Sequence, residues 1–276
     1  MINRITKKFR ELEQKGEGAL ICYVVAGYPD IATSKQVIDA LVDGGADIIE
    51  VGIPFSDPIA DGPTIQAASN IALKNGMTPE KALNLVRAVR KKYPNLPMLA
   101  MTYSNILVRP GMEKFMYDSK QCGLDGFILP DLPVDEAGTY TSVASKLNLA
   151  TVFLVSPNTR DIRLHKIAAN TTGFLYVVSV YGITGARNSF QKYTLNTIRA
   201  VKRIAGAKVP VAVGFGISRP VHAKIMIAAG AEAIIVGSAI INKISDGGSV
   251  TRMLIDLENF ARTMKRACKI KYHKTH

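Results

Sequence analysis

The sequence predicts an α/β fold, a single (β/α)₈ (TIM) barrel spanning residues 1–276. Apolar strand-like segments alternate with amphipathic helices eight times, which is typical of a parallel sheet. The strands are apolar almost throughout, as expected for strands buried on both faces. Eight such units suit a closed barrel of about 250 residues. An open doubly wound sheet is the alternative, but its usual glycine-rich loop is missing after the first strand, where the chain reads Ala26-Gly27-Tyr28-Pro29.

Each element follows from local patterns. Apolar residues at helical spacing predict an N-terminal capping helix at 2–15, ended by Gly16, within a leading segment 1–16. Asp30 and Thr78 are expected to be helix N-caps, and Pro79 fits a first helical position. Strands are predicted at 19–25, 47–53, 97–102, 125–130, 150–155, 173–179, 209–213 and 233–236. Helices are predicted at 31–42, 63–73, 79–92, 111–120, 135–147, 160–169, 194–203, 220–229, 239–244 (short) and 249–266, before a basic tail at 267–276.

Composition excludes several classes of protein. Hydrophobic residues make up 47% of the chain, enough for a large core. No apolar run approaches the roughly 20 residues that span a bilayer, and no secretory signal is present, so we expect a cytoplasmic protein. The three cysteines lie far apart and are expected to be free thiols. The net charge of +13 lies largely on predicted helix faces and in the tail without a nucleic-acid motif, which favours a solvated surface over nucleic-acid binding.

The segment 47–64 contains the strongest candidate for chemistry. Glu50 interrupts an apolar strand, where a carboxylate is costly unless it has a partner or a task. Pro54 ends the strand, and the following loop carries Asp57 and Asp61. Barrel enzymes place their active sites at the carboxyl ends of the strands, so this loop belongs to the predicted site. A structural ion pair of Glu50 with a distant cation is the alternative.

Glycines after the last strands predict a phosphate site. Gly214 and Gly216 follow strand seven, and Gly237 and Ser238 open the short helix after strand eight. Glycine lets backbone N–H groups approach an anion closely, and helix N-termini carry partial positive charge. Gly185, in the loop after strand six, is expected to contribute. Tight turns alone would also explain any one of these glycines.

The remaining residues limit the mechanism. None of the predicted strands contains a lysine, which disfavours a Schiff-base aldolase. The four histidines lie in predicted helices or the tail, so a histidine metal site or a Ser–His pair is not expected. Carboxylates, tyrosines and apolar residues remain at the barrel mouth. They favour proton transfer on a partly apolar phosphate ester, without metal or covalent intermediate.

The residues resemble a known family. The segment 49–63, Ile-Glu-Val-Gly-Ile-Pro-Phe-Ser-Asp-Pro-Ile-Ala-Asp-Gly-Pro, is similar to the hallmark of the tryptophan synthase alpha subunit. The segments 178–187, 213–217 and 235–240 resemble its later motifs, in the same order. The resemblance implies a barrel that cleaves indole-3-glycerol phosphate to indole and glyceraldehyde 3-phosphate.

By this resemblance, Glu50 and Asp61 are the catalytic acids. Glu50 gives a proton to indole C3 and takes one from the glycerol hydroxyl group, and burial should raise its pKa. Asp61 stabilises the positive charge developing on the indole nitrogen and accepts its proton. Tyr176 resembles the tyrosine beside the catalytic glutamate, and Thr184 would close a loop over the site. The implied indole pocket comprises Tyr23, Met101, Ile128 and Phe215; the family commonly has phenylalanine and leucine at the first two.

The resemblance also implies a partner. Family members pair with a beta subunit, in an alpha2beta2 heterotetramer, that receives the indole and holds pyridoxal phosphate; no cofactor is expected in this chain. The contact surface would include Pro54, Asp57 and the segment 131–133. Three alternatives stay open: a stand-alone lyase, an isomerase or epimerase of a sugar phosphate, and a non-catalytic regulator that binds a partner or nucleic acid.

Overall fold

The computed structural model describes residues 3–178, 187–214, 216–246 and 248–269, with residues 187–192 described by their backbone alone. The strands are β1 (Ala19–Val25), β2 (Ile48–Gly52), β3 (Met98–Met101), β4 (Gly126–Ile128), β5 (Ala150–Val155), β6 (Leu175–Val178), β7 (Val211–Gly214) and β8 (Ala233–Val236). The helices are α1 (Arg4–Lys15), α2 (Ile31–Asp43), α3 (Pro63–Lys74), α4 (Pro79–Lys92), α5 (Ser104–Val108), α6 (Met112–Cys122), α7 (Gly138–Lys146), α8 (Asp161–Asn170), α9 (Arg187–Ala205), α10 (Pro220–Ala228), α11 (Ser238–Ser245) and α12 (Val250–Ala267).

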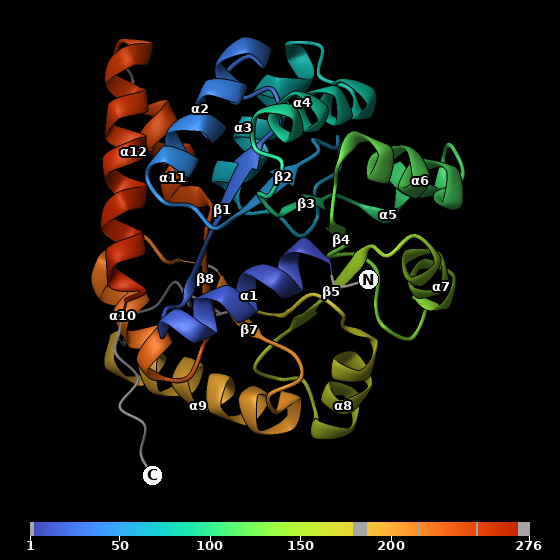
Figure 1. Cartoon of the computed structure of the whole chain (residues 1–276), viewed down its shortest axis with the longest axis vertical. Coiled ribbons are helices and arrows are strands. Elements are labelled where there is room, and N and C mark those ends of the chain that lie inside the picture. Colours follow the sequence, from blue (N-terminus) through green and yellow to red (C-terminus); the bar gives the residue numbers. More distant parts are fainter. Residues whose placement is uncertain (1–2, 179–186, 215, 247, 270–276) are drawn as a thin grey trace.

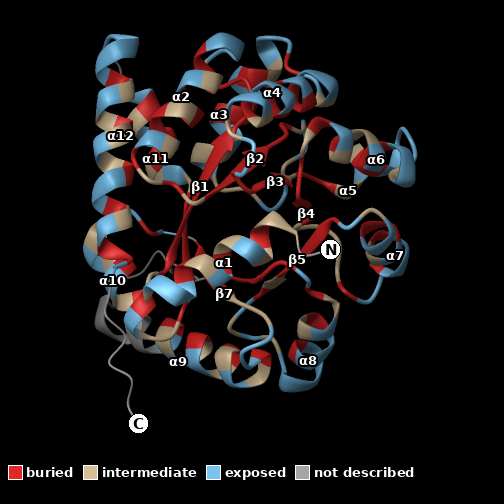
Figure 2. Cartoon of the chain, in the orientation of Figure 1, coloured by how far each residue is buried: buried red, intermediate tan, exposed pale blue. Residues whose placement is uncertain are grey.

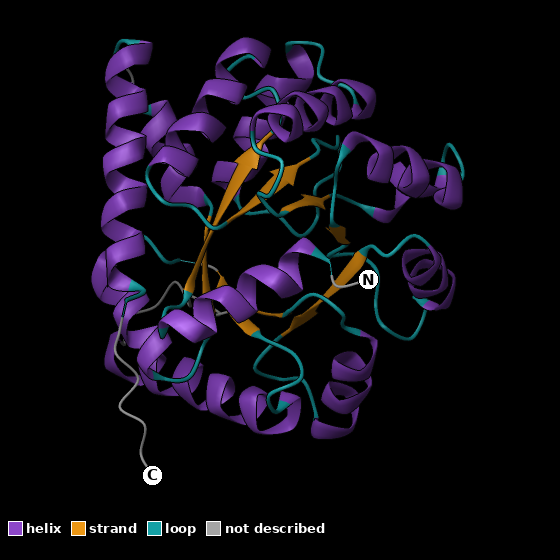
Figure 3. Ribbon diagram, viewed as in Figure 1, coloured by secondary structure: helices purple, strands orange, loops and turns teal. Residues whose placement is uncertain are grey.

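The eight strands form a closed parallel barrel. Each strand pairs with the next in sequence, and β8 pairs back onto β1. The strands form the centre of the molecule and the helices surround them (Figures 1 and 3). This confirms the predicted (β/α)₈ fold, including the extra N-terminal helix α1 and the short helix α11 after the last strand.

Two apolar cores result from the alternation of side chains along each strand. One lies between the strands and the outer helices, where nearly every strand residue is buried (Figure 2). The other fills the barrel and includes Ile21, Ile48 and Leu99. Helix α1 belongs to this inner core through its apolar face, and the ring of Phe9 lies 6.0 Å from that of Phe174. Helix α1 therefore closes the amino-terminal end of the barrel and leaves the opposite end for a site.

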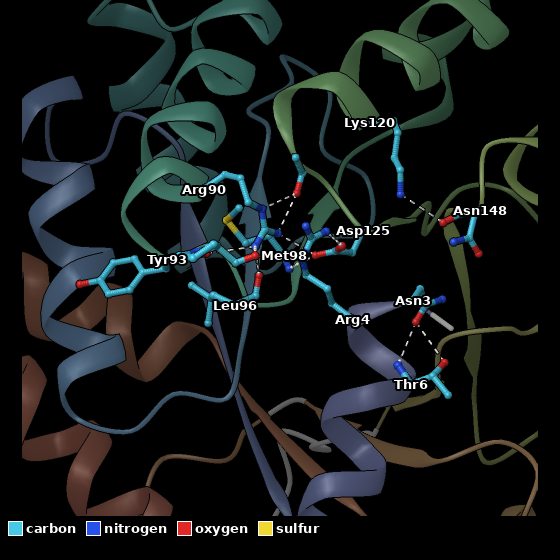
Figure 4. A network of polar contacts seen from close by, with 12 residues as sticks. Asn3, Arg4, Thr6, Arg90, Tyr93, Leu96, Met98, Lys120, Asp125 and Asn148 are labelled. Carbon is cyan, nitrogen blue, oxygen red and sulfur yellow. Dashed lines mark hydrogen bonds and ion pairs between the residues drawn. The ribbon is translucent and has the colours of Figure 1, made fainter. Parts of the chain in front are cut away.

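A buried ion-pair network fastens that closed end. The carboxylate of Asp125, at the start of β4, accepts hydrogen bonds from Arg4 of α1 and Arg90 of α4, both at 2.8 Å. It also accepts the backbone N–H of Met98 at 2.9 Å. Both guanidinium groups point at this one carboxylate (Figure 4). Because Asp125 is 1% exposed, these bonds replace the water that it loses on burial.

The predicted boundaries agree closely with the structure. The first, fifth and eighth strands have the predicted bounds, and Asp30 and Thr78 cap their helices as expected. The prediction was wrong in omitting α5 and in starting α9 at 194, because its backbone is helical from 187. The other strands are one to three residues shorter than predicted. Among the described helices, none combines the length and apolar character that crossing a lipid bilayer requires.

Candidate active site

Glu50 lies inside the barrel. It pairs in register with Tyr23 of β1 and Leu99 of β3. Two residues earlier on the same strand, Ile48 belongs to the inner core, and side chains two apart on a strand share a face. The Glu50 carboxyl group therefore points into the barrel, two residues from the carboxyl end of β2. The structure thus places Glu50, the acid that interrupts an apolar strand, at the end of the barrel where barrel enzymes have their active sites.

The environment of Glu50 favours its protonated form. The residue is 0% exposed, and neither carboxyl oxygen has a hydrogen-bond partner in the described part of the chain. Burial away from water raises the pKa of Glu50 from 4.5 to about 8. No structural ion pair with Glu50 occurs among the described residues, which disfavours the alternative considered from the sequence. At neutral pH Glu50 is therefore a protonated carboxyl group in the apolar interior of the barrel.

Two buried tyrosines lie near Glu50 inside the barrel. Tyr23 and Tyr176 are each 5% exposed. An added Cβ at Gly52 would lie 2.3 Å from the Tyr23 hydroxyl oxygen, and one at Gly214 would lie 2.4 Å from that of Tyr176. The two glycines therefore make room for the phenol rings. Burial, and then the nearby carboxyl groups, raise the pKa of both tyrosines, so both stay protonated. Glu50 and Asp61 both contribute to these shifts, which places the two acids around the same pair of rings.

Asp61 approaches the two tyrosines from the loop after β2. Its backbone N–H closes a turn onto the carbonyl oxygen of Pro58, and its carbonyl oxygen accepts the side-chain amide of Gln66. The carboxylate accepts the hydroxyl group of Tyr103 at 3.1 Å. Partial burial raises the pKa of Asp61, and the bond from Tyr103 opposes this rise. Asp61 is thus the more readily ionised of the two predicted acids, since it has a donor and Glu50 does not.

Apolar side chains complete the inner wall. Ile128 of β4 is fully buried in the inner core, and Met101 of β3 packs against that core while partly exposed. Both face the interior on strands that follow β2 around the barrel. Apolar side chains, two phenol rings and two carboxyl groups at one end of the barrel suit a flat aromatic ligand with one polar edge. Phe215, also predicted for this wall, lies outside the described residues.

The predicted phosphate turns lie at the same end of the barrel. Gly214 ends β7, and Gly216 follows with φ of +70°, a conformation that favours glycine. Gly237 precedes α11, which begins at Ser238. An added Cβ at Gly237 would lie 3.3 Å from the Tyr23 ring, so this turn packs beside Tyr23. Exposed N–H groups at a helix start attract anions. Thr184 and Gly185 lie outside the described residues.

Comparison with known proteins agrees with this geometry. A family model for "Tryptophan synthase alpha chain" matches residues 9–269. The chain belongs to the tryptophan synthase alpha chain family. A family member from Methanosarcina acetivorans is 45% identical over 262 residues, which is 95% of this chain and 93% of the relative. The tryptophan synthase subunit alpha structure from Legionella pneumophila superposes with a TM-score of 0.85 at 33% identity, over 97% of this chain and 99% of that one.

A structure of a tryptophan synthase complex from Pyrococcus furiosus is also similar. It superposes with a TM-score of 0.80 at 39% identity, over 89% of this chain and 98% of that one. The family-wide resemblance seen in the sequence is therefore confirmed, and the barrel of this chain is that of the tryptophan synthase alpha chains.

One residue beside the candidate site, Tyr103, was given no role from the sequence. Tyr103 follows β3, and its place at a strand end is visible in the sequence. Its contact with Asp61 is not visible there, because 42 residues separate the two and the contact depends on the fold of the loop. The described residues contain no cluster of histidine, cysteine and carboxylate side chains arranged to hold a metal ion, and the three cysteines are buried and unpaired.

Proposed function

We propose that this chain cleaves indole-3-glycerol phosphate to indole and D-glyceraldehyde 3-phosphate. The observation that carries the proposal is the state of Glu50. It is a fully buried, unpaired carboxyl group with a pKa of about 8 inside the barrel of a tryptophan synthase alpha chain family member. Such a group is protonated at neutral pH yet close enough to its pKa to act first as an acid and then as a base.

The reaction is a retro-aldol cleavage in two stages. Glu50 first donates its proton to indole C3, so that a C–H bond forms and the ring becomes an electron sink. Asp61 accepts the indole N–H as positive charge develops on the nitrogen. The Glu50 carboxylate then removes the hydroxyl proton from the carbon attached to C3. That O–H electron pair forms the aldehyde, the C–C bond breaks, and its electrons restore the aromatic ring as Asp61 returns to the nitrogen the proton that it accepted from it.

The remaining residues bind the substrate. In this proposal the walls formed by Tyr23, Met101 and Ile128 hold the indole ring, with Tyr176 beside Glu50. The turns at Gly216 and Gly237 provide N–H groups for the phosphate group, together with the first residue of α11, Ser238. Thr184, Gly185 and Phe215 are assigned to the same site from the sequence resemblance alone.

A beta subunit is the proposed partner. Asp57 and Ile59 are exposed on the loop that also carries Asp61, and Ile59 is 82% exposed. An apolar side chain presented next to a carboxylate suits a protein interface. We propose that this loop, with the segment 131–133, contacts the beta subunit in an alpha2beta2 assembly. Pro54, assigned to that surface from the sequence, is buried in the structure. Pyridoxal phosphate would belong to that subunit, and no cofactor is assigned to this chain.

Direct assay separates this function from the alternatives. The protein is incubated with indole-3-glycerol phosphate, with and without a tryptophan synthase beta subunit, and free indole and glyceraldehyde 3-phosphate are measured. We expect both products in equal amounts, at a higher rate with the beta subunit. Equal rates with and without it would favour a stand-alone lyase. Turnover of a plain sugar phosphate without indole release from indole-3-glycerol phosphate would favour an isomerase and refute the proposal.

A further inference from the structure

Tyr103 occupies a rigid position at the mouth of the barrel. It lies two residues beyond β3, is 5% exposed, and is the N-cap residue of α5. The next residue, Ser104, donates both its backbone N–H and its hydroxyl group to the carboxylate of Asp131, which follows β4. The backbone that carries Tyr103 is therefore fastened to two neighbouring strands of the barrel.

The hydroxyl group of Tyr103 makes two hydrogen bonds to the loop after β2. Its oxygen accepts the backbone N–H of Ala60 at 3.0 Å. Its own O–H donates to Oδ2 of Asp61 at 3.1 Å. One phenol oxygen thus acts as acceptor and donor at once, for two consecutive residues of a loop that follows the strand of Glu50.

The ring of Tyr103 is held by the same loop. The Phe55 ring lies 5.3 Å from it at an interplanar angle of 32°. This contact fixes the direction of the phenol group. Residues at both ends of the segment from Phe55 to Asp61 therefore contact Tyr103. Three contacts of different kinds therefore join this loop to the end of β3.

Asp61 has no other side-chain donor within the described part of the chain. Because Tyr103 bonds to Oδ2, Oδ1 is left to accept a substrate N–H. Without the phenol, a half-buried carboxylate would rotate freely and would lose the donor that opposes its protonation. A preorganised acceptor needs no rearrangement when charge develops on the substrate.

We propose that Tyr103 is a positioning residue, whose hydroxyl group bridges Ala60 and Asp61 and so holds the carboxylate of Asp61 ready for the indole N–H. The role at the indole rests on the proposed function, since it requires Asp61 to accept that group. The fastening of the loop does not, because it follows from contacts in the protein alone.

The variant Tyr103→Phe tests the bridge, because it keeps the ring and its contact with Phe55 and removes both hydrogen bonds. Tyr117→Phe, on the exposed surface of α6, is the matched control. We expect kcat for indole release to fall about ten-fold or more, with a smaller change in KM. The loss of activity on acidification should begin at higher pH, because the carboxylate loses its donor. Hydrogen exchange of the Ala60 amide should accelerate.

A second variant tests the same hydrogen bond if Tyr103→Phe does not fold. Incorporation of 3-fluorotyrosine at position 103 keeps the hydroxyl group and makes it a stronger donor. We expect the acidic limb of the pH profile to move to lower pH, opposite to the shift in Tyr103→Phe. Wild-type kcat and wild-type exchange at Ala60 in Tyr103→Phe, or an unmoved acidic limb in the fluorinated protein, would overturn the proposal.

The exchange measurement distinguishes this proposal from the proposed function. If the wild-type protein released no indole, the proposed function would fail, and the role of Tyr103 at the indole would fail with it. Faster exchange at Ala60 in Tyr103→Phe would still support the fastening of the loop. Indole release by the wild type, with unchanged exchange at Ala60 in Tyr103→Phe, would instead refute the bridging role of Tyr103 while supporting the proposed function.

Discussion

Replacing Glu50 by glutamine should change how the stability of the protein depends on pH. The folded state holds the Glu50 proton with a pKa of about 8, whereas the ordinary pKa of a free glutamate is 4.5. Between these two pH values the folded chain binds more protons than the unfolded chain, so wild-type stability falls as pH rises. Glutamine is neutral at every pH and removes this dependence. The variant should therefore become more stable relative to wild type as pH increases.

The size of the effect follows from the shift. The pKa of Glu50 lies about 3.5 above its ordinary value. Because each pH unit corresponds to about 1.4 kcal/mol, the free energy of unfolding of the wild type should fall by on the order of 3–5 kcal/mol between the two ends of this pH window. This loss of stability from the buried Glu50 is absent below about pH 4.5 and complete above about pH 8. The free energy of unfolding of a domain is only about 5–15 kcal/mol, so this difference is easily measured.

Urea unfolding of wild type, Glu50→Gln and a matched control measures the effect at pH 5 and pH 8. Glu113→Gln is suitable as the control, because Glu113 is exposed on α6. We expect the stability difference between Glu50→Gln and wild type to grow by about 3 kcal/mol or more from pH 5 to pH 8, and that of the control to stay constant. An equal difference at both pH values would refute the assignment of a raised pKa to Glu50.

Two further predictions concern packing and the closed end of the barrel. Gly214→Ala should reduce both activity and stability, by about 1–3 kcal/mol in unfolding free energy, because the new methyl group meets the Tyr176 hydroxyl oxygen. Gly138→Ala, where an added Cβ meets nothing within 4 Å, should be tolerated in the same urea unfolding assay; equal losses in both variants would contradict this. Asp125→Ala should cost about 3–5 kcal/mol in urea unfolding, because it leaves Arg90 largely buried without its carboxylate. A loss below about 1 kcal/mol would show that the network contributes little.

The barrel could be predicted from the sequence because its strands have clear local apolar patterns. The apolar runs of β1, β5 and β8 have clear ends, and their predicted bounds are the observed ones. Helix α5 was missed because five residues are too few for a helical period. The start of α9 was placed late because residues 187–192 are polar apart from Phe190 and give no clear helical pattern.

Some residues of the candidate site could likewise be predicted from the sequence, whereas one could not. Glu50 stands out in the sequence as a charge within an apolar strand, and the glycine turns follow adjacent strands. The role of Tyr103 could not be predicted, since it depends on how the loop with three prolines folds back over the end of β3. Local patterns therefore identify residues on the barrel frame, whereas contacts between separate loops require the coordinates.

In the proposed mechanism the buried Glu50 carboxyl group moves the proton in the cleavage of indole-3-glycerol phosphate. The most direct measurement is indole release by Glu50→Gln at pH 7, with substrate binding followed by calorimetry on the same samples. We predict that turnover falls at least about a hundred-fold while substrate still binds, because glutamine keeps the shape but has no acidic proton. Wild-type turnover by this variant would contradict the account.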